Sequence, residues 1–155
     1  RFLRDAFTRG GMAVEERVPE RILDQAEEVP YNVQRLAHEV WEAARSADAS
    51  RLAVGAVDDA LRRIVIREDP AYTQIWSQLT TNQKKGLKAV IVSGGREILA
   101  AAMTRELRIP ASSLQVALQA LLQAGLVRVE ATRGETRHRL VDPFFSHWLE
   151  MSQSS

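Results

Sequence analysis

The stretch LRIPASSLQVALQALLQAGLV, residues 107–127, decides the fold. Ile109-Pro110 predicts an extended step, because proline disfavours a helical conformation in the residue before it. The apolar side chains that follow stand at helical spacing, and they are Leu114, Ala117, Leu118, Leu121 and Leu122. Gly125 stands where a helix would end in a left-handed residue, with Leu126 placed to fold back over the last turn. The stretch therefore predicts a helix that starts after a turn and ends at Gly125.

Two short strands joined by a tight turn are predicted directly after this helix. Residues 126–130 (LVRVE) and 137–141 (RHRLV) have the composition of strands, and residues 132–135 (TRGE) supply the turn. Upstream, residues 98–107 supply the helix before the turn. This order of elements is that of a winged helix-turn-helix, a motif that usually docks on DNA or on another domain of its own chain.

The segment VDPFFSHWL, residues 141–149, predicts one more helix. Asp142 can cap it, and Pro143 suits its first position. Its aromatic face is too apolar for a solvated helix and consists of Phe144, Phe145, Trp148 and Leu149. We expect this helix to pack back on the winged domain or on the helices that precede that domain.

The length of 155 residues allows one medium domain or two small ones. No apolar run approaches the roughly 18 residues of a membrane span, so no membrane partner is expected, and no signal peptide is visible. The absence of cysteine excludes a disulfide scaffold and thiolate metal sites, and it fits a cytoplasmic protein. Because the sequence begins Arg-Phe-Leu without methionine, we expect it to be the C-terminal piece of a longer protein.

The net charge of +1 conceals two parts of opposite sign. Residues 1–79 hold 11 basic and 14 acidic residues, whereas residues 80–155 hold 10 basic and 6 acidic residues. Amphipathic helices separated by Gly10-Gly11, Pro19 and Pro30 predict a small helical bundle in the first part. Its fourth helix, over residues 56–67, should turn five side chains inward: Val57, Ala60, Leu61, Ile64 and Val65.

The predicted fold class is therefore mostly α, with a small helical bundle followed by a winged helix-turn-helix, one β-hairpin and a C-terminal aromatic helix. The bundle should occupy residues 1–69, and a connecting helix should occupy residues 70–79. The winged-helix domain with its C-terminal helix should occupy residues 80–155. Its first helix is marked by Thr80-Thr-Asn-Gln83, which has the pattern of a capping box.

The segments EVPYNVQRLAHEVW (residues 28–41) and VDPFFSHWL (residues 141–149), with the winged helix between them, resemble the C-terminal part of archaeal-type AAA+ ATPases. These belong to the wider P-loop group that includes the STAND ATPases. In that family a Gly-x-Pro-x-x-x-Gln-x-Leu stretch opens a lid helix, and an Asp-Pro-x-aromatic-x-x-Trp-Leu helix closes the chain. The resemblance spans nearly the whole sequence. It implies a lid-like bundle and an upstream ATPase domain of the same chain that holds ATP and Mg²⁺.

Two departures from the family pattern bear on cofactor binding. Glu28 stands at the glycine of the lid pattern. The resemblance matches Tyr31 to an arginine that reaches the nucleotide phosphates in the family. Arg35 lies one helical turn further on. These two residues are therefore the cofactor-binding candidates, but only in the complete protein. The chain contains no Gly-rich loop that ends in Gly-Lys-Ser/Thr, so no cofactor and no ATPase activity are expected of this piece alone.

No catalytic or metal-binding set is predicted. The three histidines lie on different predicted elements, and the paired acids fit solvated faces better than acid–base catalysis. DNA contact is an open question. The residues predicted to reach DNA are Ser112, Ser113, Gln115 and Gln119 on the helix after the turn, and Arg128, Arg133, Arg137, His138 and Arg139 on the wing.

The charges do not settle whether the winged helix contacts DNA or protein. The helix after the turn has no cation, and Glu130 and Glu135 dilute the basic wing, while Lys84, Lys85, Lys88 and Arg96 add a second basic area. If DNA is bound, the wing should supply most of the affinity. Two functions stay open: a non-catalytic regulatory and binding region of a AAA+/STAND-type ATPase, and a free-standing winged-helix transcriptional regulator.

Overall fold

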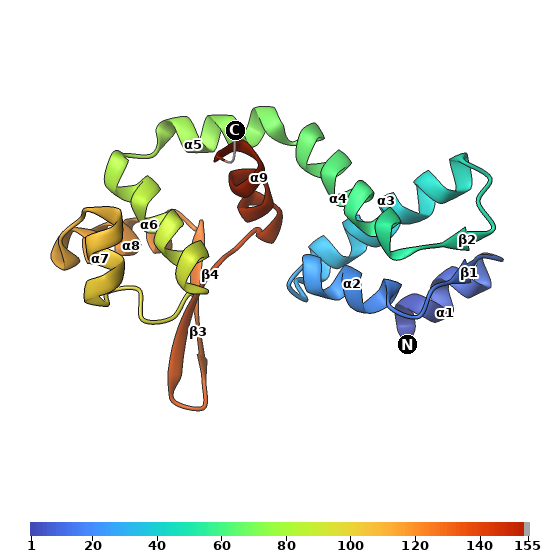
Figure 1. Cartoon of the computed structure of the whole chain (residues 1–155), viewed down its shortest axis with the longest axis horizontal. Helices are drawn as coiled ribbons and strands as arrows, with labels where there is room; N and C mark the ends of the chain where they lie inside the picture. Colours follow the sequence, from blue (N-terminus) through green and yellow to red (C-terminus); the bar gives the residue numbers. More distant parts are fainter. Residues whose placement is uncertain (154–155) are drawn as a thin grey trace. The chain divides into compact units, whose positions relative to one another are not determined.

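The computed structural model describes residues 1–153, and within them the fold is mostly helical, with nine helices and two pairs of strands (Figure 1). The chain divides into two compact units. Unit 1 contains residues 1–69 and the residues from Pro143 onward, and unit 2 is the continuous segment 70–142. A mostly helical fold with one antiparallel hairpin confirms the predicted fold class.

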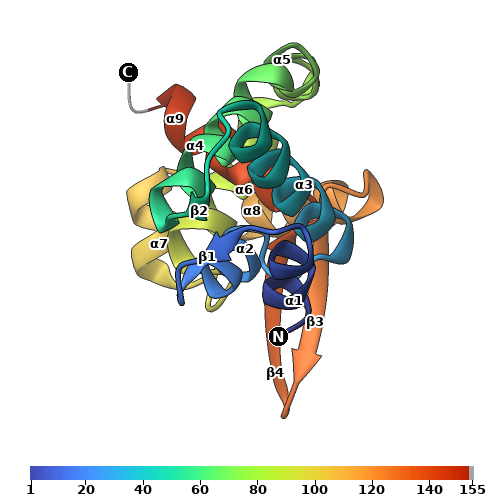
Figure 2. The same ribbon diagram turned by 90° about the vertical axis from the view of Figure 1, so that its right-hand side faces the viewer.

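Unit 1 is a helical bundle with a very short parallel strand pair. Its elements are α1 (Phe2–Arg9), β1 (Ala13–Val14), α2 (Val18–Gln25), α3 (Pro30–Ser46), β2 (Arg51–Leu52), α4 (Val54–Arg67) and α9 (Pro143–Gln153). Strand β1 pairs with β2, with Ala13 opposite Arg51, and Figure 2 shows β1 beside α1. Just after β1, the Glu15 carboxylate accepts a hydrogen bond of 3.1 Å from the backbone N–H of Val54, and so it satisfies a donor at the start of α4. This strand pair was not predicted from the sequence.

The core of unit 1 lies between α2, α3 and α4. All five side chains expected to point inward from α4 are buried. The apolar spacing of α2 and the residue after it predicts that Ile22, Leu23 and Ala26 face inward. Ile22 and Ala26 are fully buried, but Leu23 is 37% exposed, so the prediction was wrong for Leu23. The reason is geometric, because one residue step rotates a helix by about 100° and carries Leu23 away from the face that Ile22 and Ala26 share.

The terminal helix α9 completes this core. Phe144, Phe145, Trp148 and Leu149 are all buried, and the indole Nε1 of Trp148 donates to the Asp69 carboxylate at 2.7 Å. Helix α9 packs against α4. The sequence left two surfaces open for this helix, and its contacts group it with the preceding bundle. The boundaries expected from the sequence placed it in residues 80–155 instead.

Unit 2 is the winged helix. Its elements are α5 (Asp69–Gln78), which starts at the last residue of the first segment, α6 (Thr81–Ser93), α7 (Ala101–Leu107), α8 (Ala111–Gln123), β3 (Val127–Thr132) and β4 (Glu135–Leu140). The predicted capping box is present: Thr80 Oγ1 accepts from the Gln83 N–H at 3.1 Å, and Gln83 Oε1 accepts from the Thr80 N–H at 2.9 Å. In the antiparallel hairpin Val127 lies opposite Leu140, and the hairpin projects from the helices in Figure 1.

Candidate partner-binding surfaces of the winged helix

Helix α8 is held in place by its apolar face, and this fixes which side chains it exposes. Leu114, Ala117, Leu118 and Leu121 are buried, and α8 packs on α6. The helices approach closely at Gly86, where an added Cβ would lie 3.0 Å from Cδ1 of Leu121. Packing of this face turns the residues predicted to contact DNA outward: Ser112, Gln115 and Gln119 are exposed and Ser113 is half-buried.

The exposed side of α8 borders a groove without charge. The groove has a volume of about 420 Å³, and it is lined by Thr80, Asn82, Gln83, Ser112, Ser113, Val116, Ala117 and Ala120. Val116 is 70% exposed, which is high for an aliphatic side chain at the centre of a helix face. The structure thus brings Ser112 and Ser113 together with an apolar residue that the sequence analysis did not select. The sequence could have indicated that Val116 faces outward, because Val116 lies between Gln115 and Gln119, which both face outward.

Two of the four arginines of the wing are paired with a glutamate within the hairpin. Arg128 and Arg139 lie opposite each other on β3 and β4, and both form ion pairs with Glu130, Arg139 at 3.4 Å. The hydrogen bond from Arg128, with the positive charges of Arg128 and Arg139, holds the pKa of Glu130 below its usual range. One carboxylate therefore offsets part of the charge that the sequence assigned to DNA contact.

The base of the wing is fixed to the loop after α6. The Arg137 Nε donates to the Gly94 carbonyl at 2.8 Å, and the His138 N–H donates to the Gly95 carbonyl at 2.9 Å. Gly95 has φ +84°, and a Cβ at this position would lie 1.8 Å from the His138 carbonyl oxygen. Gly94 and Gly95 therefore allow the loop after α6 to pack closely against β4. Arg133, at the hairpin tip, is exposed, and its side chain forms no hydrogen bond or ion pair within residues 1–153.

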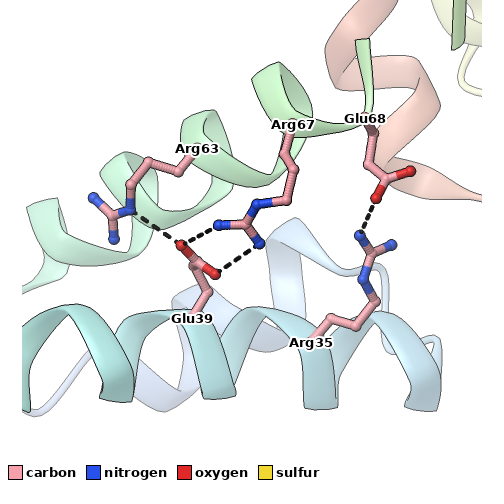
Figure 3. A network of polar contacts seen from close by, with 5 residues as sticks. All are labelled: Arg35, Glu39, Arg63, Arg67 and Glu68. Carbon is pink, nitrogen blue, oxygen red and sulfur yellow. Dashed lines mark hydrogen bonds and ion pairs between the residues drawn. The ribbon is translucent and has the colours of Figure 1, made fainter. Parts of the chain in front are cut away.

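The cofactor candidates lie on α3 in unit 1. Tyr31 is 67% exposed. The Arg35 guanidinium is 5.5 Å from the Tyr31 ring centroid and 5.7 Å from that of Phe144, and it forms an ion pair with Glu68 at 3.1 Å. The charge of Arg35 is thus already used to join α3 to the end of α4. Figure 3 shows this pair beside a second ionic cluster.

That second cluster joins α3 to α4 and was missed by the sequence analysis. Arg67 makes two hydrogen bonds to the Glu39 carboxylate, at 3.1 and 3.2 Å, and Arg63 Nε makes a third at 3.2 Å (Figure 3). Burial alone would raise the pKa of Glu39, but the hydrogen bonds and charges of the two arginines outweigh it and lower the pKa. The sequence could have indicated this cluster, because the i, i+4 spacing of Arg63 and Arg67 places both arginines on one side of α4.

The chain belongs to the family described as WHD_3, Probable winged helix domain, whose model matches residues 70–151. No curated protein matches the sequence significantly. Similar solved structures include the RuvB Holliday junction branch migration motor of Thermotoga maritima and single-substitution variants of it, at 18% identity and a TM-score of 0.40. The match covers 94% of this chain and 45% of the length of the RuvB chains.

No helix among residues 1–153 has the length and apolar content that crossing a membrane requires.

Proposed function

We propose that this chain is the regulatory C-terminal part of a AAA+/STAND-type ATPase. In this proposal unit 1 is the lid-like bundle, and the winged helix is a docking module for the upstream ATPase domain of the same cytoplasmic chain. The chain itself carries no catalytic residue. ATP and Mg²⁺ belong to the upstream domain.

The observation that carries the proposal is the backbone at Glu28, which has φ +57°. This is the left-handed region that glycine adopts without steric penalty and that other residues enter at a cost. The AAA+ lid pattern has glycine at this position. A backbone that suits glycine, two residues before the start of α3, supports the resemblance, because the residue that departs from the pattern at Glu28 still adopts a conformation that glycine enters freely.

The charges of unit 2 favour docking on protein over reading of DNA bases by α8. Specific base contacts come mostly from Arg, Lys, Asn and Gln, and Arg or Lys on guanine is the commonest of them. The exposed face of α8 offers Ser112, Gln115 and Gln119 but no cation, and its groove contains the exposed Val116. Exposed apolar side chains within a neutral groove fit a protein surface better than a phosphate backbone.

Residues 1–153 do not form a phosphate cradle. Arg35 is engaged by Glu68 and by two aromatic rings, and no Gly-Lys-Ser/Thr loop is present. ATP therefore fits this chain only as a ligand of the upstream domain. Tyr31 and Arg35, at the first turns of α3, are the residues proposed to sense that nucleotide in the complete protein.

The coding sequence upstream of Arg1 tests the proposal first. A strand followed by Gly-x4-Gly-Lys-Ser/Thr supports it, and a start codon near residue 1 contradicts it. Calorimetric titration of ATP into the 155-residue chain should give no micromolar binding. In the complete protein, Tyr31→Ala and Arg35→Ala should change the rate of ATP hydrolysis, whereas His38→Ala, on an exposed position of the same helix, should not.

The docking surface has its own test. The separately expressed upstream domain is titrated into this chain, and Val116→Glu should weaken the binding by at least tenfold. Val92→Glu is the matched control, because Val92 is 61% exposed on α6 but does not line the groove. Equal binding by the Val116→Glu variant and the unaltered chain would contradict docking through α8.

A free-standing DNA-binding regulator is the second candidate. The observation in its favour is Arg133, an exposed cation at the tip of the wing that forms no side-chain hydrogen bond or ion pair among residues 1–153. A start codon near residue 1, together with DNA binding that depends on the wing arginines, would favour this candidate over the ATPase proposal.

A further inference from the structure

The positive charge of unit 2 is concentrated away from the wing. Residues 70–142 hold 10 basic and 5 acidic residues. Half of the basic residues lie on α6 and the C-terminal end of α7, and we call these five the α6–α7 ridge: Lys84, Lys85, Lys88, Arg105 and Arg108. Helix α6 contains no acidic residue, and α7 contains only Glu106. The five cations of the ridge and Glu106 together have a net charge of +4.

Contacts join the two helices that carry the ridge. At about 100° per residue, the three lysines of α6 fall within an arc of about 100° on one side of the helix. The Lys85 Nζ donates to the Arg108 carbonyl at 3.0 Å and thereby joins α6 to the end of α7. The Lys84 Nζ lies 5.2 Å from the Trp76 ring centroid, which holds the charge at the surface.

The other three side chains of the ridge are exposed cations. Lys88, Arg105 and Arg108 are exposed, and among residues 1–153 their side chains form no hydrogen bond, ion pair or ring contact. The hairpin differs, because its four arginines face two glutamates and two of the arginines pair with Glu130. Its net charge is +2, half that of the ridge and Glu106 together. The stronger and less compensated positive surface is thus the ridge.

We propose that the α6–α7 ridge is a second binding surface, which contacts the phosphate backbone of nucleic acid without reading its sequence. Lys84 and Lys88 are about 6 Å apart along the axis of α6, a spacing similar to the roughly 7 Å of axial rise over two phosphates of one strand of B-DNA. Lysine is a point charge that suits phosphate, and it is depleted in protein–protein interfaces, so three lysines favour a nucleic acid over an acidic protein. The proposal does not rest on the ATPase assignment.

The test is fluorescence anisotropy of a labelled 20-base-pair duplex of arbitrary sequence, titrated with the 155-residue chain between 50 and 200 mM salt. The ridge variant combines Lys88→Gln, Arg105→Gln and Arg108→Gln, which are exposed positions whose loss should leave the fold intact. Losing three phosphate contacts should lower the slope of log K against log salt by about 2.7 and weaken binding at least tenfold at 50 mM salt.

Two further variants remove the same charge from other places. Arg17→Gln, Arg45→Gln and Arg51→Gln, all exposed in unit 1, should leave the affinity within twofold of the unaltered chain. Arg133→Gln, Arg137→Gln and Arg139→Gln in the wing should have a smaller effect than the ridge variant. Circular dichroism confirms that each variant is folded.

Several results would overturn the proposal. They are no DNA binding at 50 mM salt, equal loss in the unit 1 variant, and loss confined to the wing variant. A polyglutamate peptide serves as the second probe. Tighter ridge-dependent binding of polyglutamate than of duplex would assign the ridge to an acidic protein instead.

Discussion

Unit 1 and unit 2 are both mainly helical, but they are assembled from the chain in different ways. Unit 2 is one continuous segment, in which each helix or strand follows directly from its neighbour. Unit 1 combines residues from both ends of the chain. The indole N–H of Trp148 donates a hydrogen bond to the Asp69 carboxylate, and His147 Nε2 lies 3.2 Å from the Gln25 carbonyl oxygen. The winged helix is complete within one segment, whereas the bundle is incomplete until α9 is present.

The two units also differ in sign of charge. Unit 1 has 11 basic and 15 acidic residues, and unit 2 has 10 basic and 5 acidic residues. In unit 1 the arginines at the α3–α4 contact are matched by Glu39 and Glu68, whereas the cations of unit 2 are partly uncompensated on the ridge. Charge therefore holds helices together in unit 1 and is available to a partner in unit 2.

The largest expected effect tests the dependence of unit 1 on α9. Trp148→Ala should lower its free energy of unfolding by about 3–5 kcal/mol, because the ring is buried, stacks on Phe145 and donates to Asp69. Urea unfolding followed by circular dichroism measures the loss. Trp76→Ala, at a half-buried position in unit 2, should cost clearly less. An unchanged midpoint for Trp148→Ala would show that unit 1 does not depend on α9.

A second substitution should destabilise unit 2 alone. Gly95→Ala places a Cβ against the His138 carbonyl at a residue with φ +84°, and it should cost about 2–3 kcal/mol. Gly94→Ala is the matched control, because Gly94 has φ +67° but nothing within 4 Å of an added Cβ. Its cost should be about 1 kcal/mol, from backbone strain only. Equal costs would mean that the loop is not held tightly on β4.

A third substitution tests the ionic contact between α3 and α4. Glu39→Gln should cost about 1–2 kcal/mol at neutral pH, because two arginines lose a charged acceptor. The folded-state pKa of Glu39 lies below its ordinary value of 4.5, so this stabilisation is fully present above pH 4.5 and is lost as the pH falls through the folded pKa.

The pH dependence provides the control for this contact. The difference in unfolding free energy between the Glu39→Gln variant and the unaltered chain should shrink as the pH falls below 4.5. Glu42→Gln, on the same helix, should give a smaller difference. A Glu39→Gln effect that is independent of pH would show that packing of the side chain, and not its charge, joins the two helices.

The smallest expected effect concerns the strained residue before α3. Glu28→Gly should raise the stability of unit 1 by about 0.5–1 kcal/mol, because glycine adopts φ +57° without the Cβ penalty. Glu20→Gly, within the exposed side of α2, should lower stability by about 1 kcal/mol through its loss of helix propensity. If both substitutions destabilise unit 1 equally, the left-handed backbone at Glu28 stores no strain.

Much of the fold could be predicted because its signals are local. The capping box at Thr80, the proline at the start of α3 and the inward positions of α4 depend on residues within one or two helical turns. The β3–β4 hairpin depends on a two-residue turn. The candidate site could be predicted only in part, since helical spacing shows that Ser112, Gln115 and Gln119 face outward but not what they face.

The sequence by itself therefore determined the order and type of the elements, the aromatic nature of α9 and the outward face of α8. Only the tertiary structure decided that α9 completes the bundle and that β1 pairs with β2. It also decided that Glu130 offsets the charges of Arg128 and Arg139, and that the backbone of Gly95 lies against β4. The physical reason is the separation along the chain over which each interaction acts. Propensity and capping act between near neighbours along the chain, whereas packing, ion pairing and close backbone approach depend on which distant segments meet.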